Sequence, residues 1–195
     1  MLSILTTNRY EVIFGLWNTT ASGNSVLATE GLGVGKYDAM YPPQNIFDQE
    51  TDSSYISFGS CSNRAASLSC GIRTGFIVIP AQGGTLLLAI RFSTSANTPE
   101  SDPLTITIEG SNETSSTLIL GNRWFLIFNG SSGLDVDPGR STNGAVQCFT
   151  NNSAWYTSYR VLVTSKRGIS NSVQYSEVRL FGRPNPKPGK PCLVS

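Results

Sequence analysis

The pattern of apolar and polar residues along the chain predicts β-strands. The segment 103–109 alternates Leu or Ile with Thr or Glu, and the segment 84–92 also carries apolar residues at every second position. Because successive side chains of a strand point to opposite faces, this period places one apolar face toward a core. The predicted core-facing side chains are Leu104, Ile106 and Ile108 in the first segment and Leu86, Leu88, Ile90 and Phe92 in the second.

Further short apolar segments, separated by Gly, Pro, Asn and Ser, predict additional strands. They span 76–79, 118–120, 124–128, 159–163 and 177–181, with weaker candidates at 10–17, 25–29 and 55–58. Segment 76–79 is apolar on both faces and is expected in the centre of a sheet. Strands that recur in this way favour an all-β fold, an antiparallel β-sandwich of the jelly-roll type. Residues 1–182 are predicted to form one module and the Pro-rich residues 183–195 a tail or linker.

The composition argues against several classes of function. The net charge is +1 with 14% charged residues, so the chain lacks the basic surface that nucleic-acid binding requires. It contains no histidine, which excludes Ser-His-Asp and Cys-His catalytic arrangements. No apolar run approaches the roughly 20 residues of a transmembrane helix. We therefore expect a non-enzymatic protein with no nucleic-acid partner and no transmembrane segment.

Cysteines and glycosylation motifs indicate an extracellular location. The four cysteines are Cys61, Cys70, Cys148 and Cys192, and N-x-S/T sequons occur at Asn18, Asn112, Asn129 and Asn151. An even number of cysteines without a C-x-x-C motif favours disulfides, which persist in oxidising compartments. We favour a bond between Cys61 and Cys70, which would close a short polar loop, and a second between Cys148 and Cys192, which would hold the C-terminal tail. The sequence alone proves neither pairing.

Two stretches of the chain resemble galactose-binding-like domains, the group that contains the discoidin (coagulation-factor type C) modules and related carbohydrate-binding modules. Residues 45–55, NIFDQETDSSY, are similar to the family segment A-F-D-G-x-x-x-T-x-W. Residues 172–182, SVQYSEVRLFG, are similar to its closing strand, and residues 106–112 and 124–130 fit its middle strands. The resemblance implies a jelly-roll fold and a carbohydrate-binding function. The chain departs from the family pattern at Gln49 and Tyr55, where Gly and Trp are usual.

The resemblance also implies a structural Ca²⁺ site. Many carbohydrate-binding members hold Ca²⁺ where the Asp-containing loop meets the closing strand. The matching residues in this chain are Asp48, Ser53 and Glu177. Ca²⁺ prefers six to eight oxygen ligands that include carboxylates, so this donor set is chemically suitable. The alternative interpretation is that Asp48 caps a turn and Glu177 pairs with a nearby arginine.

The family binds its ligand in loops at one end of the sandwich, and five residues of this chain are candidates for that role. Sugars bind to aromatic faces and to planar hydrogen-bond donors, which the predicted loops supply. The candidates are Arg64, Asn97, Arg140, Trp155 and Tyr156. The alternative is that Trp155 closes the end of the sandwich and the arginines are ordinary surface charges. Trp17 and Trp124 lie in apolar strand patterns and are predicted to be in the core.

These observations predict a secreted, lectin-like module that binds a glycan or glycoprotein. The alternative is a structural or adhesive subunit of an extracellular assembly, whose partners would be copies of itself or other extracellular proteins. A low charge and a surface rich in Ser, Thr and Asn fit both hypotheses.

Overall fold

The computed structural model describes residues 3–6, 11–114 and 116–185, and strands dominate these ranges. The strands are β1 (Ser3–Ile4), β2 (Val12–Trp17), β3 (Val26–Leu27), β4 (Thr29–Glu30), β5 (Lys36–Tyr37), β6 (Tyr55–Ser57), β7 (Gly75–Ile79), β8 (Thr85–Phe92), β9 (Pro103–Ser111), β10 (Phe125–Ser131), β11 (Gln147–Cys148), β12 (Ser158–Lys166), β13 (Val173–Tyr175) and β14 (Val178–Pro184). Short 3-10 helices span Pro43–Phe47 (η1), Pro99–Ser101 (η2) and Gly121–Arg123 (η3). No helix in the described ranges is long and apolar enough to cross a membrane.

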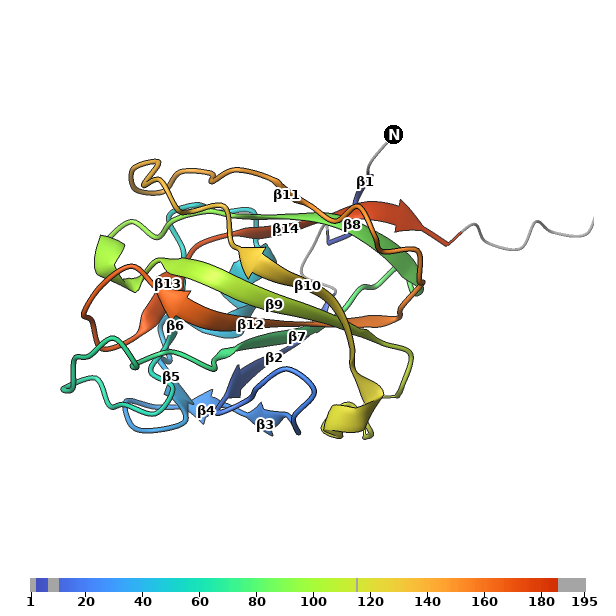
Figure 1. Cartoon of the computed structure of the whole chain (residues 1–195). Coiled ribbons are helices and arrows are strands. Elements are labelled where there is room, and N and C mark those ends of the chain that lie inside the picture. The colour runs from blue at the N-terminus through green and yellow to red at the C-terminus, as the bar shows by residue number, and fades with distance from the viewer. Residues whose placement is uncertain (1–2, 7–10, 115, 186–195) are drawn as a thin grey trace, which may run out of the picture.

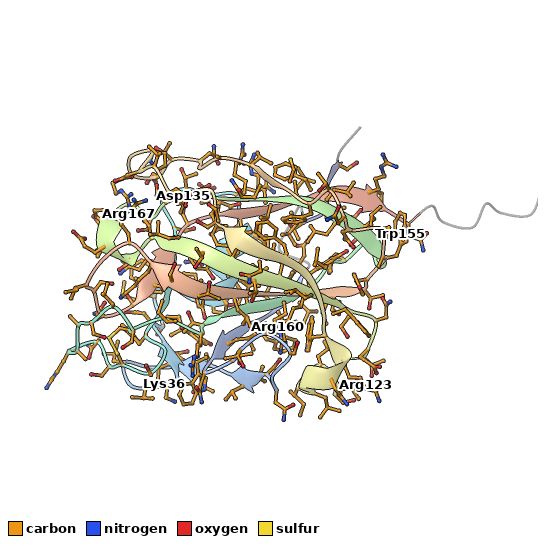
Figure 2. The ribbon with its side chains drawn as sticks, in the orientation of Figure 1. Lys36, Arg123, Asp135, Trp155, Arg160 and Arg167 are labelled. Carbon is orange, nitrogen blue, oxygen red and sulfur yellow. A yellow bond between two sulfur atoms is a disulfide. The ribbon has the colours of Figure 1, made fainter. Side chains whose placement is uncertain are left out.

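The strands form two main sheets that pack face to face (Figure 1). One sheet has the order β10-β9-β12-β7-β2-β3 and the other the order β1-β14-β8-β11, with antiparallel neighbours throughout. A smaller sheet, β13-β6-β5-β4, lies beside them and contains the parallel pair β4–β5. The predicted all-β sandwich is confirmed. The loops gather at opposite ends, with Asp135 and Arg167 at one and Trp155 at the other (Figure 2).

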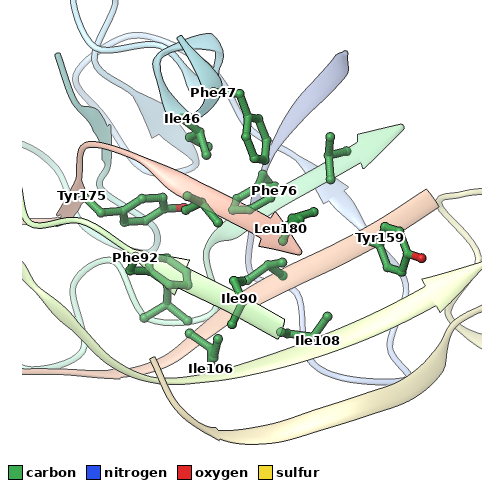
Figure 3. Close-up of a cluster of buried hydrophobic side chains, with 14 of the residues drawn as sticks. Ile46, Phe47, Phe76, Ile90, Phe92, Ile106, Ile108, Tyr159, Tyr175 and Leu180 are labelled. Atoms are coloured by element: carbon green, nitrogen blue, oxygen red, sulfur yellow. The ribbon is translucent and has the colours of Figure 1, made fainter. Parts of the chain in front are cut away.

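The hydrophobic core lies between the two main sheets (Figure 3). Ile106 and Ile108 of β9 are fully buried there, as their alternation predicts. Tyr175 packs edge-on against Phe92, with ring centroids 5.1 Å apart, and against Tyr55 at 5.7 Å. Edge-to-face contacts of this kind stabilise aromatic cores beyond the burial of area. The Tyr55 ring therefore occupies core space although the family pattern has Trp at this position.

The predicted core face of β8 is only partly correct. Ile90 and Phe92 are buried in the core as expected, but Leu86 and Leu88 are half-buried and Leu87 is fully buried instead. Strand β14 pairs with β8 through an irregularity that leaves Leu88 without a partner residue. One unpaired residue reverses the in-and-out alternation of the strand beyond it. The period of two therefore breaks at this bulge.

The segment 118–120, predicted as a strand, forms a turn. Leu118 is nevertheless buried, and its carbonyl accepts a hydrogen bond of 2.9 Å from Trp124 Nε1. Together with Leu16, Ile77 and Leu162 these residues form a second hydrophobic cluster. This cluster lies on the outer face of the six-stranded sheet, because neighbouring residues of the same strands point into the main core. The apolar residues of 118–120 cover a sheet instead of extending it.

Two other predictions, the burial of Trp17 and the end of the module at residue 182, differ from the structure. Trp124 is buried as predicted, but Trp17 is only half-buried, with its ring against Gly35. Strand β14 continues to Pro184, beyond the predicted module boundary at residue 182, because Pro184 pairs with Thr85 at the start of β8. Residues 186–195, which include Cys192 and most of the predicted tail, lie outside the described residues.

Candidate functional site

One end of the sandwich presents exposed aromatic side chains, which we call the aromatic end (Phe125, Trp155 and Tyr156). Phe125 is 59% exposed and Trp155 is 36% exposed. The ring of Phe125 stacks on that of Tyr156, with centroids 6.4 Å apart and planes inclined by 18°. Tyr156 in turn meets Tyr159 edge-on at 6.2 Å. The exposed ring of Phe125 is therefore supported from below by aromatic side chains that reach into the core.

Hydrogen bonds hold the loop that carries the aromatic end. Tyr156 and Thr85 exchange backbone hydrogen bonds of 2.8 and 2.9 Å, which attach the loop to the start of β8. Asn112 donates its amide to the Trp155 carbonyl at 3.0 Å, and Asn152 donates to the Leu87 carbonyl at 2.7 Å. A loop held at several points presents its side chains in one arrangement, which reduces the entropy lost when a ligand binds.

The Tyr156 ring has room to pack on β9 only because residue 110 is a glycine. A Cβ atom at residue 110 would lie 2.2 Å from the ring of Tyr156. Gly110 pairs with Phe125 across β9 and β10, so the strand leaves space for the ring of Tyr156 beside Phe125. Burial raises the pKa of the Tyr156 hydroxyl, which consequently stays protonated at neutral pH and able to donate a hydrogen bond.

The opposite end of the sandwich is held by an ion-pair network, which we call the ion-pair end (Asp102, Asp137, Arg140 and Arg167). Arg140 donates to both oxygens of the fully buried Asp102 carboxylate, at 2.8 and 2.7 Å, and also pairs with Asp137. Hydrogen bonds to Asp102 raise the pKa of Arg140 above its ordinary value. Arg167 reaches Asp102 from the β12–β13 loop at 3.3 Å and donates to the carbonyls of Leu134 and Asp135. These arginines bridge three loops and have few donors left for a ligand.

A pair of carboxyl groups lies beside β14, near the ion-pair end. Glu177 is buried beside the side chain of Asp48, and its Oε1 accepts a hydrogen bond from the backbone N–H of Gln49. Burial, together with the neighbouring Asp48, raises the pKa of Glu177 to about 8. Ser53 donates to the Glu50 carbonyl at 3.0 Å, and Asp48 also accepts from the Glu50 N–H at 2.9 Å.

This carboxyl pair fits part of a Ca²⁺ site. Two carboxyl groups in contact in a buried position are destabilised when both are ionised, and a cation between them removes that cost. Two of the three predicted ligands, Asp48 and Glu177, are therefore brought together. No cluster of three or more Asp, Glu or Cys side chains suited to a metal occurs in the described part of the chain, so other ligands would have to be backbone carbonyls or the Ser53 hydroxyl.

Comparison with solved structures identifies the fold. No protein-family model matches the sequence, and no curated protein matches it. A family 32 carbohydrate-binding module of Clostridium perfringens NanJ, solved with galactose, superimposes with a TM-score of 0.56 over 93% of this chain and 99% of that one, at 6% identity. A second module from the same organism, solved with GalNAc-β-1,3-galactose, gives a TM-score of 0.57 over 92% and 100%, at 10% identity. The chain has the fold of family 32 carbohydrate-binding modules.

Another module with this fold comes from a family 31 glycoside hydrolase of Clostridium perfringens, with a TM-score of 0.55, 13% identity and coverage of 78% of this chain and 91% of that one. The superpositions establish the carbohydrate-binding-module fold. The sequence identities are too low to transfer individual site residues, which therefore follow from this structure alone. The galactose-binding-like resemblance in the sequence is confirmed as a likeness of fold.

The five predicted ligand residues do not form one site within this carbohydrate-binding-module fold. Trp155 and Tyr156 lie at the aromatic end, whereas Arg140 and the exposed Asn97 lie at the ion-pair end. Strand β8 separates them, because its first residue pairs with Tyr156 and Ser93, just after its end, contacts Asn143. Eight residues of strand span about 26 Å. A small sugar at one end cannot reach the other.

Arg64 lies in a third position, on the loop closed by a disulfide between Cys61 and Cys70. The structure contains the cysteine pair that the sequence analysis favoured. Arg64 is exposed, and the adjacent Asn63 carbonyl accepts a hydrogen bond of 2.9 Å from Asn171 in the β12–β13 loop. Cys148 is exposed and has no disulfide partner among the described residues. Its predicted partner, Cys192, lies outside them. The asparagines of all four sequons are exposed.

Phe125 is a surface residue that the sequence pattern did not reveal. The segment 124–128 is predicted as a strand with Trp124 in the core, and no face is predicted for Phe125. Trp124 is buried against the outer sheet face, whereas Phe125 is exposed at the start of β10. The strand period alone does not predict this exposure. It places residue 125 on the face opposite Trp124, and Phe125 is exposed there because β10 is the edge strand of the sheet.

Proposed function

We propose that this chain is an extracellular, non-catalytic carbohydrate-binding module that binds sugar at its aromatic end. The observation that carries the proposal is the exposed ring of Phe125, which stacks on Tyr156, together with the exposed Trp155 that precedes Tyr156 in the same loop. Aromatic faces bind the C–H surfaces of sugars, and such exposed rings are otherwise costly in water. The fold and the internal disulfide support the same conclusion.

A glycan array probed with the full chain tests this proposal. We expect binding to a defined sugar class. Since single-site affinities of about 1 mM correspond to only about −4 kcal/mol, the array should be probed with a multivalent form of the chain. Replacing Phe125 or Trp155 by alanine should weaken binding about tenfold or more, because each loses an aromatic contact of about 1 kcal/mol together with its buried area.

Val136 supplies the matched control. It is 83% exposed and lies in the β10–β11 loop that carries Arg140, so the variant Val136→Ala removes exposed apolar surface away from the aromatic end. Its binding should equal that of the wild type. An array that stays blank with the wild-type chain, or equal binding by Phe125→Ala, would rule out sugar recognition at the aromatic end.

Ca²⁺ bound by Asp48 and Glu177 is a second part of the proposal. The ion would neutralise the two carboxyl groups that are in contact and hold the loop containing Asp48 against β14. We expect Ca²⁺ to raise the melting temperature of the chain, EDTA to reverse this, and Asp48→Asn to abolish it. The position of Glu177 beside β14, away from Phe125, predicts that Ca²⁺ stabilises the fold more than it changes sugar affinity. An unchanged melting temperature would contradict the site.

Assembly with other copies is the alternative function, and one observation favours it. Strand β10 is the edge of the six-stranded sheet, and both Phe125 and Leu126 on it are more than half exposed. Exposed edge strands pair readily with other chains. Polymers in light scattering that disappear in Phe125→Ala, together with a blank glycan array, would support assembly in place of sugar binding.

A further inference from the structure

A groove with a mixed apolar and hydroxyl lining runs over the outer face of the six-stranded sheet, away from the aromatic end. It consists of two adjoining depressions, each of about 280 Å³, that share Ile72 and Arg73. One is bounded by residues 19–21 and by residues 162–164 of β12, and the other by Asn18, Ser60 and Ser69. Small-molecule sites usually measure about 300–1,000 Å³, so each depression is close to the size needed for one sugar unit.

The groove has one charged residue and many hydroxyl groups. Among the described residues, Arg73 is the only charged side chain that lines it. Arg73 is exposed, and its guanidinium has no hydrogen bond or ion pair with any of them. The hydroxyl groups around it belong to Thr19, Thr20, Ser60, Ser69, Thr107 and Thr164. A cation without a partner in such surroundings favours an anionic, hydroxyl-rich ligand, because a guanidinium binds a carboxylate or sulfate through paired hydrogen bonds.

The backbone of Arg73 is held in an unusual conformation. Its φ is +62°, in the left-handed region that non-glycine residues seldom adopt. Its N–H donates to the Val163 carbonyl at 2.9 Å, and its carbonyl accepts from the Thr19 N–H at 3.1 Å. These hydrogen bonds fix the position of Arg73 between the two walls of the groove. Strained residues that are fixed in this way are frequent at ligand sites.

Thr107 provides an independent sign of a ligand. Ile106 and Ile108 point into the core, so Thr107 between them points to the outer face, where it lines the groove. Thr107 is 5% exposed, yet its hydroxyl has no hydrogen-bond partner in the described structure. Buried hydroxyl groups are nearly always paired, and an unpaired one costs free energy. A ligand hydroxyl in the groove would complete this hydrogen bond.

We propose that this groove is a second saccharide site, specific for acidic sugars, in which Arg73 binds the carboxylate and Thr107 a hydroxyl group. Ile72 and Leu162, which also line the groove, provide apolar contact for the sugar ring. The site uses none of the residues of the aromatic end. Loss of binding in this groove and loss of binding at the aromatic end can therefore be measured independently.

Titration of the full chain with D-galacturonic acid, followed by amide chemical shifts in NMR, tests the proposal. Shifts should concentrate at Ile72, Thr107 and Thr164. D-galactose, which lacks the carboxylate, should bind the groove at least tenfold more weakly. Sodium acetate and sodium sulfate distinguish a sugar site from a simple anion site. If either of them shifts the same amides at the same concentration as galacturonic acid, the saccharide proposal is wrong.

Two variants assign the roles of the residues. Arg73→Asn removes the charge but keeps a residue that tolerates positive φ, and it should weaken galacturonate binding at least tenfold. Thr107→Val keeps the shape of the side chain without its unpaired hydroxyl. It should weaken binding severalfold while leaving the melting temperature unchanged or higher, which a purely structural role would not produce. Arg64→Gln, an exposed arginine on the disulfide loop, is the matched control. Equal galacturonate binding by Arg73→Asn and Arg64→Gln would overturn the proposal.

Discussion

At the scale of single residues, the buried ion pair of Arg160 and Glu109 is the most consequential interaction. Both side chains are fully buried, and Arg160 Nε donates to Glu109 Oε2 at 2.7 Å. Arg160 also donates to the Gly23 carbonyl at 2.9 Å, and its guanidinium lies 4.8 Å from the Trp124 ring centroid. The pair thereby joins residues 22–25 and 118–124 to the outer face of the six-stranded sheet.

Removing one member of this pair should be strongly destabilising. We expect Arg160→Met to lower the free energy of unfolding by about 3–5 kcal/mol, because it leaves the Glu109 carboxylate buried without a counter-charge. The double variant Arg160→Met with Glu109→Gln should recover part of the loss. Arg123, whose ion pair with Glu113 is half exposed, is the control, and Arg123→Met should cost less than about 1 kcal/mol. Urea unfolding measures all three. Equal losses for Arg160→Met and Arg123→Met would contradict this account.

This pair also shows a limit of sequence analysis at the residue scale. The alternation in 103–109 places Glu109 on the face opposite Ile106 and Ile108, where a charged residue is ordinarily exposed. The side chain is 0% exposed, because residues 22–25 and 118–124 fold over it. The two groups that donate to Glu109, the Ser22 N–H and Arg160, are 87 and 51 residues away in the sequence. No local pattern contains that information.

At the scale of elements, the disulfide loop between β6 and β7 was the most predictable feature. Cys61 and Cys70 are separated by 9 residues, and the loop is further attached by the Ser67–Ser170 bridge to the β12–β13 loop. A bond across a short loop acts mainly by restricting the unfolded chain. The prediction succeeded because two cysteines close in sequence need no knowledge of the rest of the fold to meet.

The disulfide should make a moderate contribution to stability. Replacing Cys61 and Cys70 together by alanine should lower the free energy of unfolding by about 2–3 kcal/mol, from the chain-entropy relation for a loop of this length. Cys148→Ala is the control, and since Cys148 is exposed, that substitution should change stability by less than about 0.5 kcal/mol. Chemical unfolding under non-reducing conditions gives both values. A loss confined to Cys148→Ala would show that the stabilising cysteine is a different one.

At the scale of the whole molecule, burial shifts the pKa values of a lysine and several tyrosines in and around the core. Lys166, at the end of β12, donates its ammonium to the Ser170 and Ser172 carbonyls and the Ser170 hydroxyl, and burial lowers its pKa to about 8. Burial raises the pKa of Tyr159 to about 12 and also raises those of Tyr55 and Tyr175. The folded and unfolded chains therefore bind different numbers of protons in alkaline solution.

Within the alkaline range, the Lys166 and tyrosine shifts predict a local maximum of stability near pH 9–10. Between about pH 8 and 10 the unfolded chain keeps the Lys166 proton that the folded chain has lost, so stability rises with pH. Above about pH 10 the unfolded chain loses tyrosine protons that the folded chain retains, so stability falls. Urea unfolding from pH 7 to 11 measures the profile. Lys166→Met should remove the rise and leave the fall. Identical profiles for the variant and the wild type would exclude Lys166 as its origin.

The sequence by itself determined the fold class, the burial of Ile106 and Ile108 in β9, the burial of Trp124 and the short disulfide, whereas Leu104, also predicted in the core, is half-buried. Each of these depends on neighbours a few residues away, through the strand period or a small loop. Only the tertiary structure decided which residues share a site. It placed Trp155 and Arg140 at opposite ends of β8, and it brought Arg73 and Thr107 to one groove. The type of each side chain determines which ligand groups it can bind. The pairing of strands that are distant in the sequence determines which side chains can bind the same ligand.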